Sequence, residues 1–302
     1  MKLPLSFSFE VMTAMAAGTP IVALESTIIT HGMPYPQNIE TARMIEAEIR
    51  GQGVTPATIA IMDGAIHIGL SDERLEDLAQ SADVLKLSRA DLAFAVANGQ
   101  TGATTVAATM ICAHLAGIQV FATGGIGGVH RGAENTFDIS ADLEELAKTP
   151  VIVVGAGAKA ILDLPKTLEI LETRGVPVVT FGQDEFPAFW SRASGLQSPL
   201  RADSAEEIAA AYNMRETLDL EGGMFVANPI PKADEIPSAE MAPVIEQAIK
   251  EAIVQGVGAK AVTPFLLQRI FELTDGRSLE CNIALVKNNA MLATKISKAL
   301  KS

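Results

Sequence analysis

Short apolar runs that can form buried strands recur along the chain, with helix-like stretches between them. The runs are IVALEST (21–27), TIAIMDG (58–64), IQVFATG (118–124), VIVVGAG (151–157) and VPVVTFG (176–182). Runs this rich in β-branched and other apolar residues are typical of strands that are buried on both faces of a sheet. The alternation therefore predicts an α/β fold of three layers (α/β/α), in which helices cover a mostly parallel central sheet.

Segments with a helical spacing of apolar residues lie between these runs and after them. They are 39–54, 106–118, 160–175 (which Pro165 limits or restarts) and 206–220. The final third also predicts helices, in AIKEAIVQG, TPFLLQRIFELTDG and CNIALVKNNAMLATKISKAL. Because no internal repeat or linker divides the 302 residues, we expect a single domain that spans residues 1–302.

Composition excludes several classes of protein. Hydrophobic residues make up 48% of the chain and charged residues 20%, which excludes an intrinsically disordered protein. No apolar run reaches the ~18 residues of a membrane-spanning helix, and the N-terminal segment lacks the pattern of a signal peptide. The net charge of −13 opposes binding to nucleic acid. Cys112 and Cys281 are typical of buried thiols in a reducing compartment, so we expect a cytoplasmic protein.

Polar side chains follow several of the apolar runs. Residues 25–27 (Glu-Ser-Thr) end the first run, Asp63 ends the second, and the segment 130–142 and Lys159 follow two later runs. In open α/β sheets, ligands bind at the edge where the carboxyl ends of the strands meet. These polar groups are therefore the candidates for a binding or catalytic site.

Lys159 follows the apolar run 151–154. Gly155 and Gly157 allow a tight turn into the helix-like segment AKAILD (158–163), which predicts a strand-to-helix corner at the lysine. Partial desolvation and the positive end of a helix dipole both disfavour a charged amine there, and they make a lysine nucleophilic near neutral pH. The alternative is an ordinary solvated lysine near the start of a helix.

The glycine-rich turns do not match the nucleotide-binding loops. GGIGGVH (124–130) lacks the third glycine of a dinucleotide loop, and GAGAKA (155–160) lacks the spacing and the hydroxyl residue of a P-loop. We therefore expect no nucleotide or organic cofactor. The glycines still permit backbone amides to approach a ligand closely, although a plain tight turn explains them equally well.

A phosphate group has candidate ligands in two neighbouring segments. Thr101, Thr104 and Thr105 precede an amphipathic helix, whose free N–H groups can bind an anion. The segment KLSR (86–89) adds two cations and a hydroxyl, with Lys86 as a point charge. Ordinary helix capping is the alternative interpretation of the threonines.

A divalent cation has candidate ligands in FDISADLEEL (137–146), which reads as a turn that enters an acidic helix. One of its aspartates, Asp138 or Asp142, is sufficient for Mg²⁺ or Mn²⁺ when waters and substrate oxygens complete the shell. Capping of the helix by acidic residues is the alternative. The four histidines show no zinc-site spacing.

The segment 183–240 differs in composition from the rest of the chain, because parts of it are rich in proline and acidic residues. This composition predicts long loops on the surface. It contains the neighbouring aromatic residues Phe189 and Trp190. Such a pair can line a binding site, although packing in the core or at an interface is the more usual role of an aromatic pair.

Ten segments, in order along nearly the whole chain, form a specific set. They are ALESTIITHGMPYPQN (23–38), KLSRADL (86–92), TGATTVAATM (101–110), FATGGIGGVHRG (121–132), DISADL (138–143), VVGAGAKAILD (153–163), DEFPAF (184–189), ANPIP (227–231), TPFLL (263–267) and NIALVKNNA (282–290). Together they closely resemble the pseudouridine-5′-phosphate glycosidase family, also called the indigoidine synthase A-like family. Gly155 is a departure, because many members of that family are expected to have cysteine there.

The resemblance implies reversible cleavage of the C–C glycosidic bond of pseudouridine 5′-phosphate to uracil and ribose 5-phosphate, in pseudouridine catabolism. It also implies a homotrimer that uses Mn²⁺, although Mg²⁺ fits an oxygen-ligand site equally well. It assigns Lys159 as the nucleophile, Glu25 as the proton donor and Asp138 as the metal ligand. The implied substrate contacts are Lys86, Val106, His130, Ser140, Ala141, Asp142 and Asn282.

The chemistry explains why such a reaction needs a lysine. An ordinary glycosidase protonates a heteroatom that leaves, whereas C5 of uracil has no lone pair to protonate. An electron sink is required at C1′, and Lys159 provides one as a Schiff base (iminium) while Glu25 protonates the ring oxygen. Two alternatives remain open: a related glycosidase that acts on another phosphorylated nucleoside or sugar, and a non-catalytic protein that binds a sugar phosphate.

Overall fold

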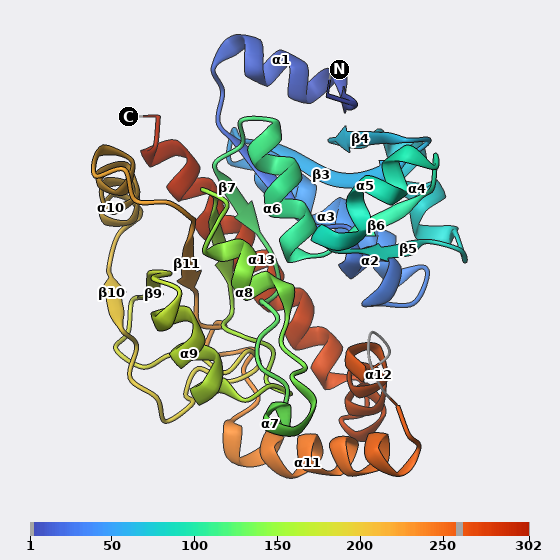
Figure 1. The fold of residues 1–302 in the computed structure, drawn as a ribbon, viewed down its shortest axis with the longest axis vertical. Coiled ribbons are helices and arrows are strands. Elements are labelled where there is room, and N and C mark those ends of the chain that lie inside the picture. Colours follow the sequence, from blue (N-terminus) through green and yellow to red (C-terminus); the bar gives the residue numbers. More distant parts are fainter. Residues whose placement is uncertain (1–2, 258–261, 302) are drawn as a thin grey trace.

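The computed structural model describes residues 3–257 and 262–301 and places a sheet between two layers of helices (Figure 1). The strands are β1 (Leu5–Phe7), β2 (Ile21–Leu24), β3 (Thr55–Met62), β4 (Ala65–Ile68), β5 (Leu85–Leu87), β6 (Gly102–Thr104), β7 (Val120–Ala122), β8 (Ile152–Gly155), β9 (Val178–Phe181), β10 (Leu200–Ala202) and β11 (Met224–Ala227). The helices are α1 (Phe9–Ala17), α2 (Thr27–His31), α3 (Gln37–Gly51), α4 (Asp72–Gln80), α5 (Arg89–Ala97), α6 (Val106–Leu115), α7 (Ala133–Thr136), α8 (Ala141–Leu146), α9 (Leu164–Thr173), α10 (Ala205–Thr217), α11 (Ser238–Val254), α12 (Val262–Leu273) and α13 (Arg277–Ala299).

The described strands are hydrogen-bonded in the order β1-β4-β3-β2-β7-β8-β11-β9-β10, with β6 beside β3 and β5 beside β6. From β3 to β10 along this order each pair is parallel, whereas β3 is antiparallel to both β4 and β6. The chain proceeds from β2 to β3 on one side and from β7 to β8 on the other. The direction of winding therefore reverses between β2 and β7, which is where open α/β sheets form a crevice.

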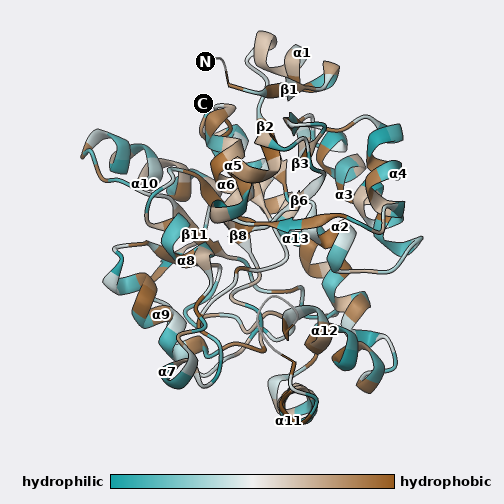
Figure 2. Ribbon diagram, turned by 45° about the vertical axis from the view of Figure 1, so that its right-hand side comes forward, coloured by the Kyte–Doolittle hydropathy of each residue, from teal (hydrophilic) through white to brown (hydrophobic). Residues whose placement is uncertain are grey.

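Helices cover both faces of the sheet. α13 packs on β2, β7 and β8 and contacts α3 and α10, whereas α6 packs on β2, β3 and β7 and contacts α5 and α8. Figure 1 shows α6 in front of the sheet and α13 behind it. Figure 2 shows hydrophilic residues on the outer turns of helices such as α4 and α10. The predicted three-layer fold with a mostly parallel sheet is confirmed, whereas the single domain 1–302 stays a prediction.

The predicted strand runs each overlap a strand of the sheet, namely β2, β3, β7, β8 and β9, although β3 begins at Thr55, three residues before its run. Every residue of β8 is buried; the strand lies between β7 and β11 in the sheet, and α13 packs on it. Six of the described strands were not predicted from the sequence, and each is three or four residues long: β1, β4, β5, β6, β10 and β11. Among the described helices none is both long and apolar enough to span a membrane.

The prediction of a helix over 158–163 was wrong. These residues form an irregular connection, and α9 begins at Leu164, where the Asp163 side chain accepts a hydrogen bond from the N–H of Lys166 at 3.1 Å. Pro165 falls in the first turn of α9, where its missing N–H leaves no hydrogen bond unmade. Lys159 therefore lies in the connection before α9 and not at the start of a helix.

A buried amide joins α13 to the end of β7. The side-chain nitrogen of Asn289 donates to the carbonyl oxygens of Thr123 at 2.8 Å and Gly124 at 3.3 Å, and its oxygen accepts from Asn228 at 3.1 Å. Asn289 is 0% exposed, so water cannot replace these hydrogen bonds. This amide fixes the backbone that follows β7.

We expect Asn289→Ala to lower the free energy of unfolding by about 1 to 3 kcal/mol, because it leaves buried polar groups without partners. Urea unfolding followed by circular dichroism measures the change. Asn213→Ala, at an exposed position of α10, is the control and should stay within about 0.5 kcal/mol of the parent chain. Equal stabilities of the two variants would contradict the role given to Asn289.

Candidate active site

A cavity of about 450 Å³ opens at the carboxyl ends of β2, β7 and β8, at the reversal point of the sheet. Its volume is within the range of about 300 to 1,000 Å³ that is typical of small-molecule sites. Its lining includes each residue that the family resemblance assigns to the site, namely Glu25, Lys86, Val106, His130, Asp138, Ser140, Ala141, Asp142, Lys159 and Asn282. Ser26 and Asp63, which were also candidates as polar residues at strand ends, do not line it. The fold therefore brings together residues that lie far apart in the sequence, while the individual roles stay predictions.

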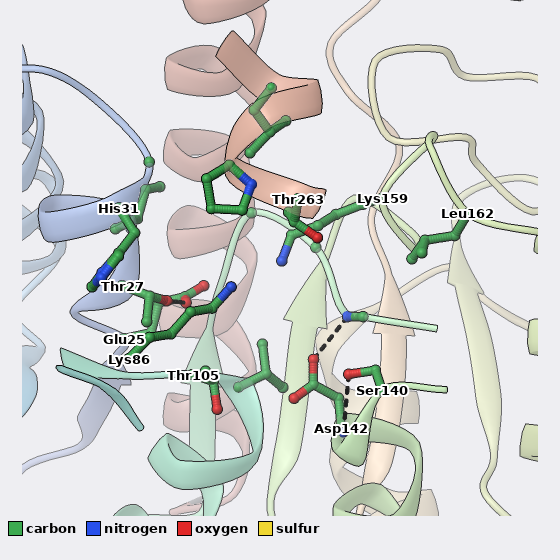
Figure 3. Close-up of a pocket in the computed structure, with 18 of the residues that line it drawn as sticks. Glu25, Thr27, His31, Lys86, Thr105, Ser140, Asp142, Lys159, Leu162 and Thr263 are labelled. Carbon is green, nitrogen blue, oxygen red and sulfur yellow. Dashed lines mark hydrogen bonds between the residues drawn. The ribbon is translucent and has the colours of Figure 1, made fainter. Parts of the chain in front are cut away.

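Glu25 immediately follows β2 and is 9% exposed. Its two carboxyl oxygens each face a threonine hydroxyl: Thr27 donates to Oε2, and Thr123, which follows β7, donates to Oε1. Figure 3 shows Glu25 and Thr27 side by side at the cavity. Because Asn289 holds the carbonyl of Thr123, the orientation of Glu25 depends on α13 as well as on the sheet.

Lys159 lies on the connection that follows β8, and it is partly buried. Its N–H donates to the carbonyl of Ile126 at 3.1 Å, which ties this connection to the turn after β7. Gly157 has a φ of +101°, and a Cβ there would collide with the carbonyl oxygen of Pro187, so only glycine fits. In Figure 3 the amino groups of Lys159 and Lys86 enter the cavity from opposite sides.

Asp142 joins two backbone segments at the cavity. Its Oδ1 accepts from the N–H of Ala107 at 2.9 Å, and its Oδ2 accepts from the N–H of Gly127 at 2.8 Å. Ser140, the N-cap of α8, accepts from the N–H of Asp142 at 3.2 Å (Figure 3). A Cβ at Gly127 would collide with Ser140 Oγ, so this glycine allows the close approach of protein groups. Asp142 therefore holds the start of α6 and the glycine turn in place.

The cationic end of the cavity contains Lys86 on β5 and His31 at the end of α2, with Ser88 and Thr105 nearby in the lining. Burial lowers the pKa of His31, and the positive charge of Lys86 lowers it further. His31 Nδ1 lies 2.5 Å from the hydroxyl of Thr30. A neutral imidazole, two hydroxyls and an ammonium group suit a phosphate ester.

Some of the residues that were predicted to bind a phosphate group lie away from the cavity. Arg89 Nε lies 2.6 Å from Oε2 of the buried carboxylate of Glu145, and Arg89 does not line the cavity. Thr104 Oγ1 donates to the carbonyl of Ile59 at 2.9 Å, and Thr101 is also absent from the lining. Of that group, Lys86, Ser88 and Thr105 remain at the cavity.

Asp138 and His130 lie together at another side of the cavity, with 3.8 Å between Asp138 Oδ2 and His130 Nδ1. Burial lowers the pKa of His130, whereas the charge of Asp138 acts in the opposite direction. Within residues 3–257 and 262–301, no three His, Cys, Asp or Glu side chains form a metal-binding group. Asp138 is 42% exposed and offers one carboxylate, which fits an oxygen-preferring cation that keeps most of its waters.

An apolar wall completes the cavity, and Phe189 is the one member of it that was a candidate from the sequence. Its members are Phe189, Pro264, Leu267, Leu285 and Val286. Thr27 was a candidate as a polar residue at a strand end, whereas His31 and Thr263 were not predicted as site residues, although both lie inside segments of the family resemblance. Phe189 contacts Trp190 edge-on, with ring centroids 5.0 Å apart, so this aromatic pair both lines the cavity and packs in the core.

Gly155, the departure from the family pattern, ends β8 with Gly125 and Thr123 beside it. A Cβ at this position would lie 3.3 Å from the Cα of Gly125 and 3.4 Å from the methyl group of Thr123. A side chain here would require its neighbours to shift by a few tenths of an ångström. Gly155 itself does not line the cavity.

Comparison with known proteins gives one consistent result. The family model described as "Indigoidine synthase A like protein" matches residues 10–299. A relative from Jannaschia sp. (strain CCS1) is 69% identical over 300 residues, which cover 99% of each chain. Its name is pseudouridine-5′-phosphate glycosidase. A relative with the same name from Roseobacter denitrificans is 67% identical, over 99% of this chain and 96% of its own.

Two solved structures share the fold. The prealnumycin C-glycosynthase AlnA, in complex with ribulose 5-phosphate, superposes with a TM-score of 0.92 and 38% identity, over 100% of this chain and 98% of its own. An indigoidine synthase A-like protein from Thermotoga maritima has a TM-score of 0.90 and 37% identity, over 99% and 97% of the two chains. The family match, the close relatives and the shared fold lead to one conclusion: this chain belongs to the indigoidine synthase A-like family.

Proposed function

We propose that the chain reversibly cleaves the C–C glycosidic bond of pseudouridine 5′-phosphate to give uracil and ribose 5-phosphate. The observation that carries this proposal is the meeting of a lysine, Lys159, and a buried glutamate, Glu25, in one cavity with a cationic end. The names of the relatives that are 67% and 69% identical support the same reaction.

The cavity suggests an orientation for the substrate. The phosphate group lies at the cationic end, where Lys86 provides charge and Ser88 and Thr105 provide hydroxyls. The uracil ring lies against the apolar wall beside Phe189, because a flat base buries well against an aromatic side chain. The ribose then lies between them, beside Glu25 and Lys159. Binding of the phosphate contributes binding energy at a distance from the bond that breaks.

The first chemical step opens the ribose ring. Glu25 donates a proton to the ring oxygen O4′ as the bond between C1′ and O4′ breaks, and the uncharged amine of Lys159 adds to C1′. The hydroxyls of Thr27 and Thr123 keep the carboxyl group of Glu25 in one orientation during this transfer. The product of the step is an open-chain sugar attached to Lys159 through C1′.

The second step releases the base. The carboxylate of Glu25 takes one proton from the newly attached nitrogen, which restores the lone pair, and this proton is passed to C5 of uracil. The bond between C1′ and C5 then breaks as the lone pair of the lysine nitrogen forms a C=N bond with C1′. Uracil leaves, and an iminium of ribose 5-phosphate remains on Lys159. Water hydrolyses this iminium to ribose 5-phosphate and the free lysine, so that one water molecule is consumed per turnover.

Asp138 is the residue that would hold the divalent cation, Mn²⁺ or in its place Mg²⁺. Its exposed carboxylate at the cavity supports this assignment, because such cations accept one protein carboxylate together with waters. When bound, the cation would attract substrate oxygens and offset negative charge. Neither a nucleotide nor an organic cofactor is part of the proposal.

The wider setting of the reaction also belongs to this proposal. We infer a homotrimer in the cytoplasm that acts in pseudouridine catabolism on a small molecule, with neither nucleic acid nor a membrane as a partner. Cys112 and Cys281 are both buried free thiols, which supports a reducing compartment.

A second candidate is a related reaction on another phosphorylated sugar or nucleoside. The similarity to a C-glycosynthase in complex with ribulose 5-phosphate favours it, because that enzyme also carries a sugar phosphate at this fold. The identity of 38% to that enzyme is much lower than the 69% to a pseudouridine-5′-phosphate glycosidase. Turnover of uridine 5′-phosphate, but not of pseudouridine 5′-phosphate, would favour the second candidate.

We expect Lys159→Arg to lower kcat by roughly a thousandfold or more, because a guanidinium group keeps the charge but cannot add to C1′. Borohydride with ribose 5-phosphate should attach a reduced sugar to Lys159 in the parent chain, and peptide mass spectrometry locates the adduct. Lys148→Arg, at an exposed position in the turn after α8, is the matched control. Tight sugar-phosphate binding without an adduct would indicate a non-catalytic binding protein.

We expect Thr123→Val to lower kcat about tenfold, because the Glu25 carboxyl loses one of the two hydroxyls that orient it. Thr123→Ser keeps a hydroxyl and should retain most of the parent kcat. Glu25→Gln should lower kcat by a factor of about 10² to 10⁴. Steady-state kinetics with pseudouridine 5′-phosphate measure all three variants. Equal rates for the valine and serine variants would show that the hydroxyl does not assist Glu25.

A further inference from the structure

Asn282 has a side chain whose two ends face different surroundings. It lies on α13, one turn before Leu285 and Val286, and all three residues line the cavity. Its Oδ1 accepts a hydrogen bond of 2.7 Å from the indole nitrogen of Trp190. Among the residues that the structure describes, the Nδ2 group of Asn282 has no hydrogen-bond partner.

The indole of Trp190 determines which way the Asn282 amide points. An indole N–H can donate but cannot accept, so it pairs with the oxygen of the amide and never with the nitrogen. Trp190 is 1% exposed and packs edge-on against Phe189, so it cannot turn toward water. Reversing the amide would leave the buried indole N–H opposite a second donor, which is unfavourable. The NH₂ group of Asn282 is therefore directed away from Trp190.

The surroundings of Asn282 identify the part of the substrate that it meets. Phe189, Leu285 and Val286 form the apolar wall against which the base is proposed to lie. A donor in such a wall favours a ligand atom that accepts a hydrogen bond, because a buried polar group without a partner is costly. A carbonyl oxygen of uracil meets this requirement, whereas an exocyclic amino group would place a donor against a donor.

We propose that Trp190 is a positioning residue that holds Asn282 as a hydrogen-bond donor, and that this donor selects bases with a carbonyl oxygen over bases with an amino group. The inference rests on the proposed function and adds the origin of its base specificity. Trp190 acts through Asn282 and does not contact the substrate.

The test compares the parent chain with Trp190→Phe, which keeps an aromatic ring but removes the N–H. Uracil, cytosine and isocytosine serve as competitive inhibitors of the cleavage of pseudouridine 5′-phosphate; the last two each replace one carbonyl of uracil with an amino group. The parent chain should bind one analogue about tenfold or more weakly than uracil. In Trp190→Phe this preference should fall to about threefold or less, because the amide is then free to present its oxygen. In Trp190→Phe, KM for pseudouridine 5′-phosphate should rise by a larger factor than the factor by which kcat falls.

Asn282→Asp provides a second variant in case Trp190→Phe does not fold. One carboxylate oxygen can still accept from Trp190, but the donor is lost, so the preference for uracil should disappear. Thermal unfolding checks that each variant is folded. An unchanged preference for uracil in folded Trp190→Phe, or equal binding of the three bases by the parent chain, overturns this inference but leaves the proposed function in place. Failure of the parent chain to cleave pseudouridine 5′-phosphate removes the proposed function as well.

Discussion

Parallel strands can lie side by side only when the chain crosses a face of the sheet between them, and the site depends on this constraint. Each crossing returns the chain to the side of the sheet where the parallel strands begin. The carboxyl ends of β2, β7 and β8 therefore all lie together on the other side. The winding reverses between β2 and β7, and therefore no crossing connection covers the gap at their ends. Glu25 follows β2 and Lys159 follows β8, and they reach one cavity for this reason.

Strand ends bring the groups near one another, and buried hydrogen bonds then determine their orientation. Asn289 holds the backbone after β7, Asp142 joins the glycine turn to α6, and Trp190 holds Asn282. In each case the two partners are distant in the sequence. A buried hydrogen bond contributes only modestly to net stability, but breaking one side of it is costly, so such contacts favour a single geometry.

The fold was largely predictable from the sequence, because uninterrupted apolar runs such as that of β8 indicate strands buried on both faces. Strands of three residues, such as β5 and β6, were missed because so short a segment shows no periodicity. The helix expected at 158–163 was wrong because its apolar spacing is also compatible with an irregular connection. Glu25 and Lys159 were found as polar residues at strand ends. The pairing of Thr123 with Glu25 was not found, because it depends on which strands are neighbours.

The site residues on α13 could not be predicted from the helical pattern of the sequence, for a different reason. A helical pattern indicates which face of a helix is apolar, but Leu285 and Val286 are apolar whether they face a core or a cavity. Asn282 was expected at the site only through the family resemblance. That the side-chain oxygen of Asn282 is turned toward Trp190 follows from packing between segments that are far apart in the sequence.

The turn at Gly157 has a consequence for attempts to alter this protein. The carbonyl of Pro187 occupies the space beside Gly157, and the N–H of Phe189 donates to the carbonyl of Ala156 at 3.0 Å. The loop that carries the aromatic pair and the connection that carries Lys159 are thus packed as one piece. Replacing that loop to accept a different base would displace the lysine along with it. An engineer who wants a new base preference should vary α13, whose side chains change the wall without moving the nucleophile.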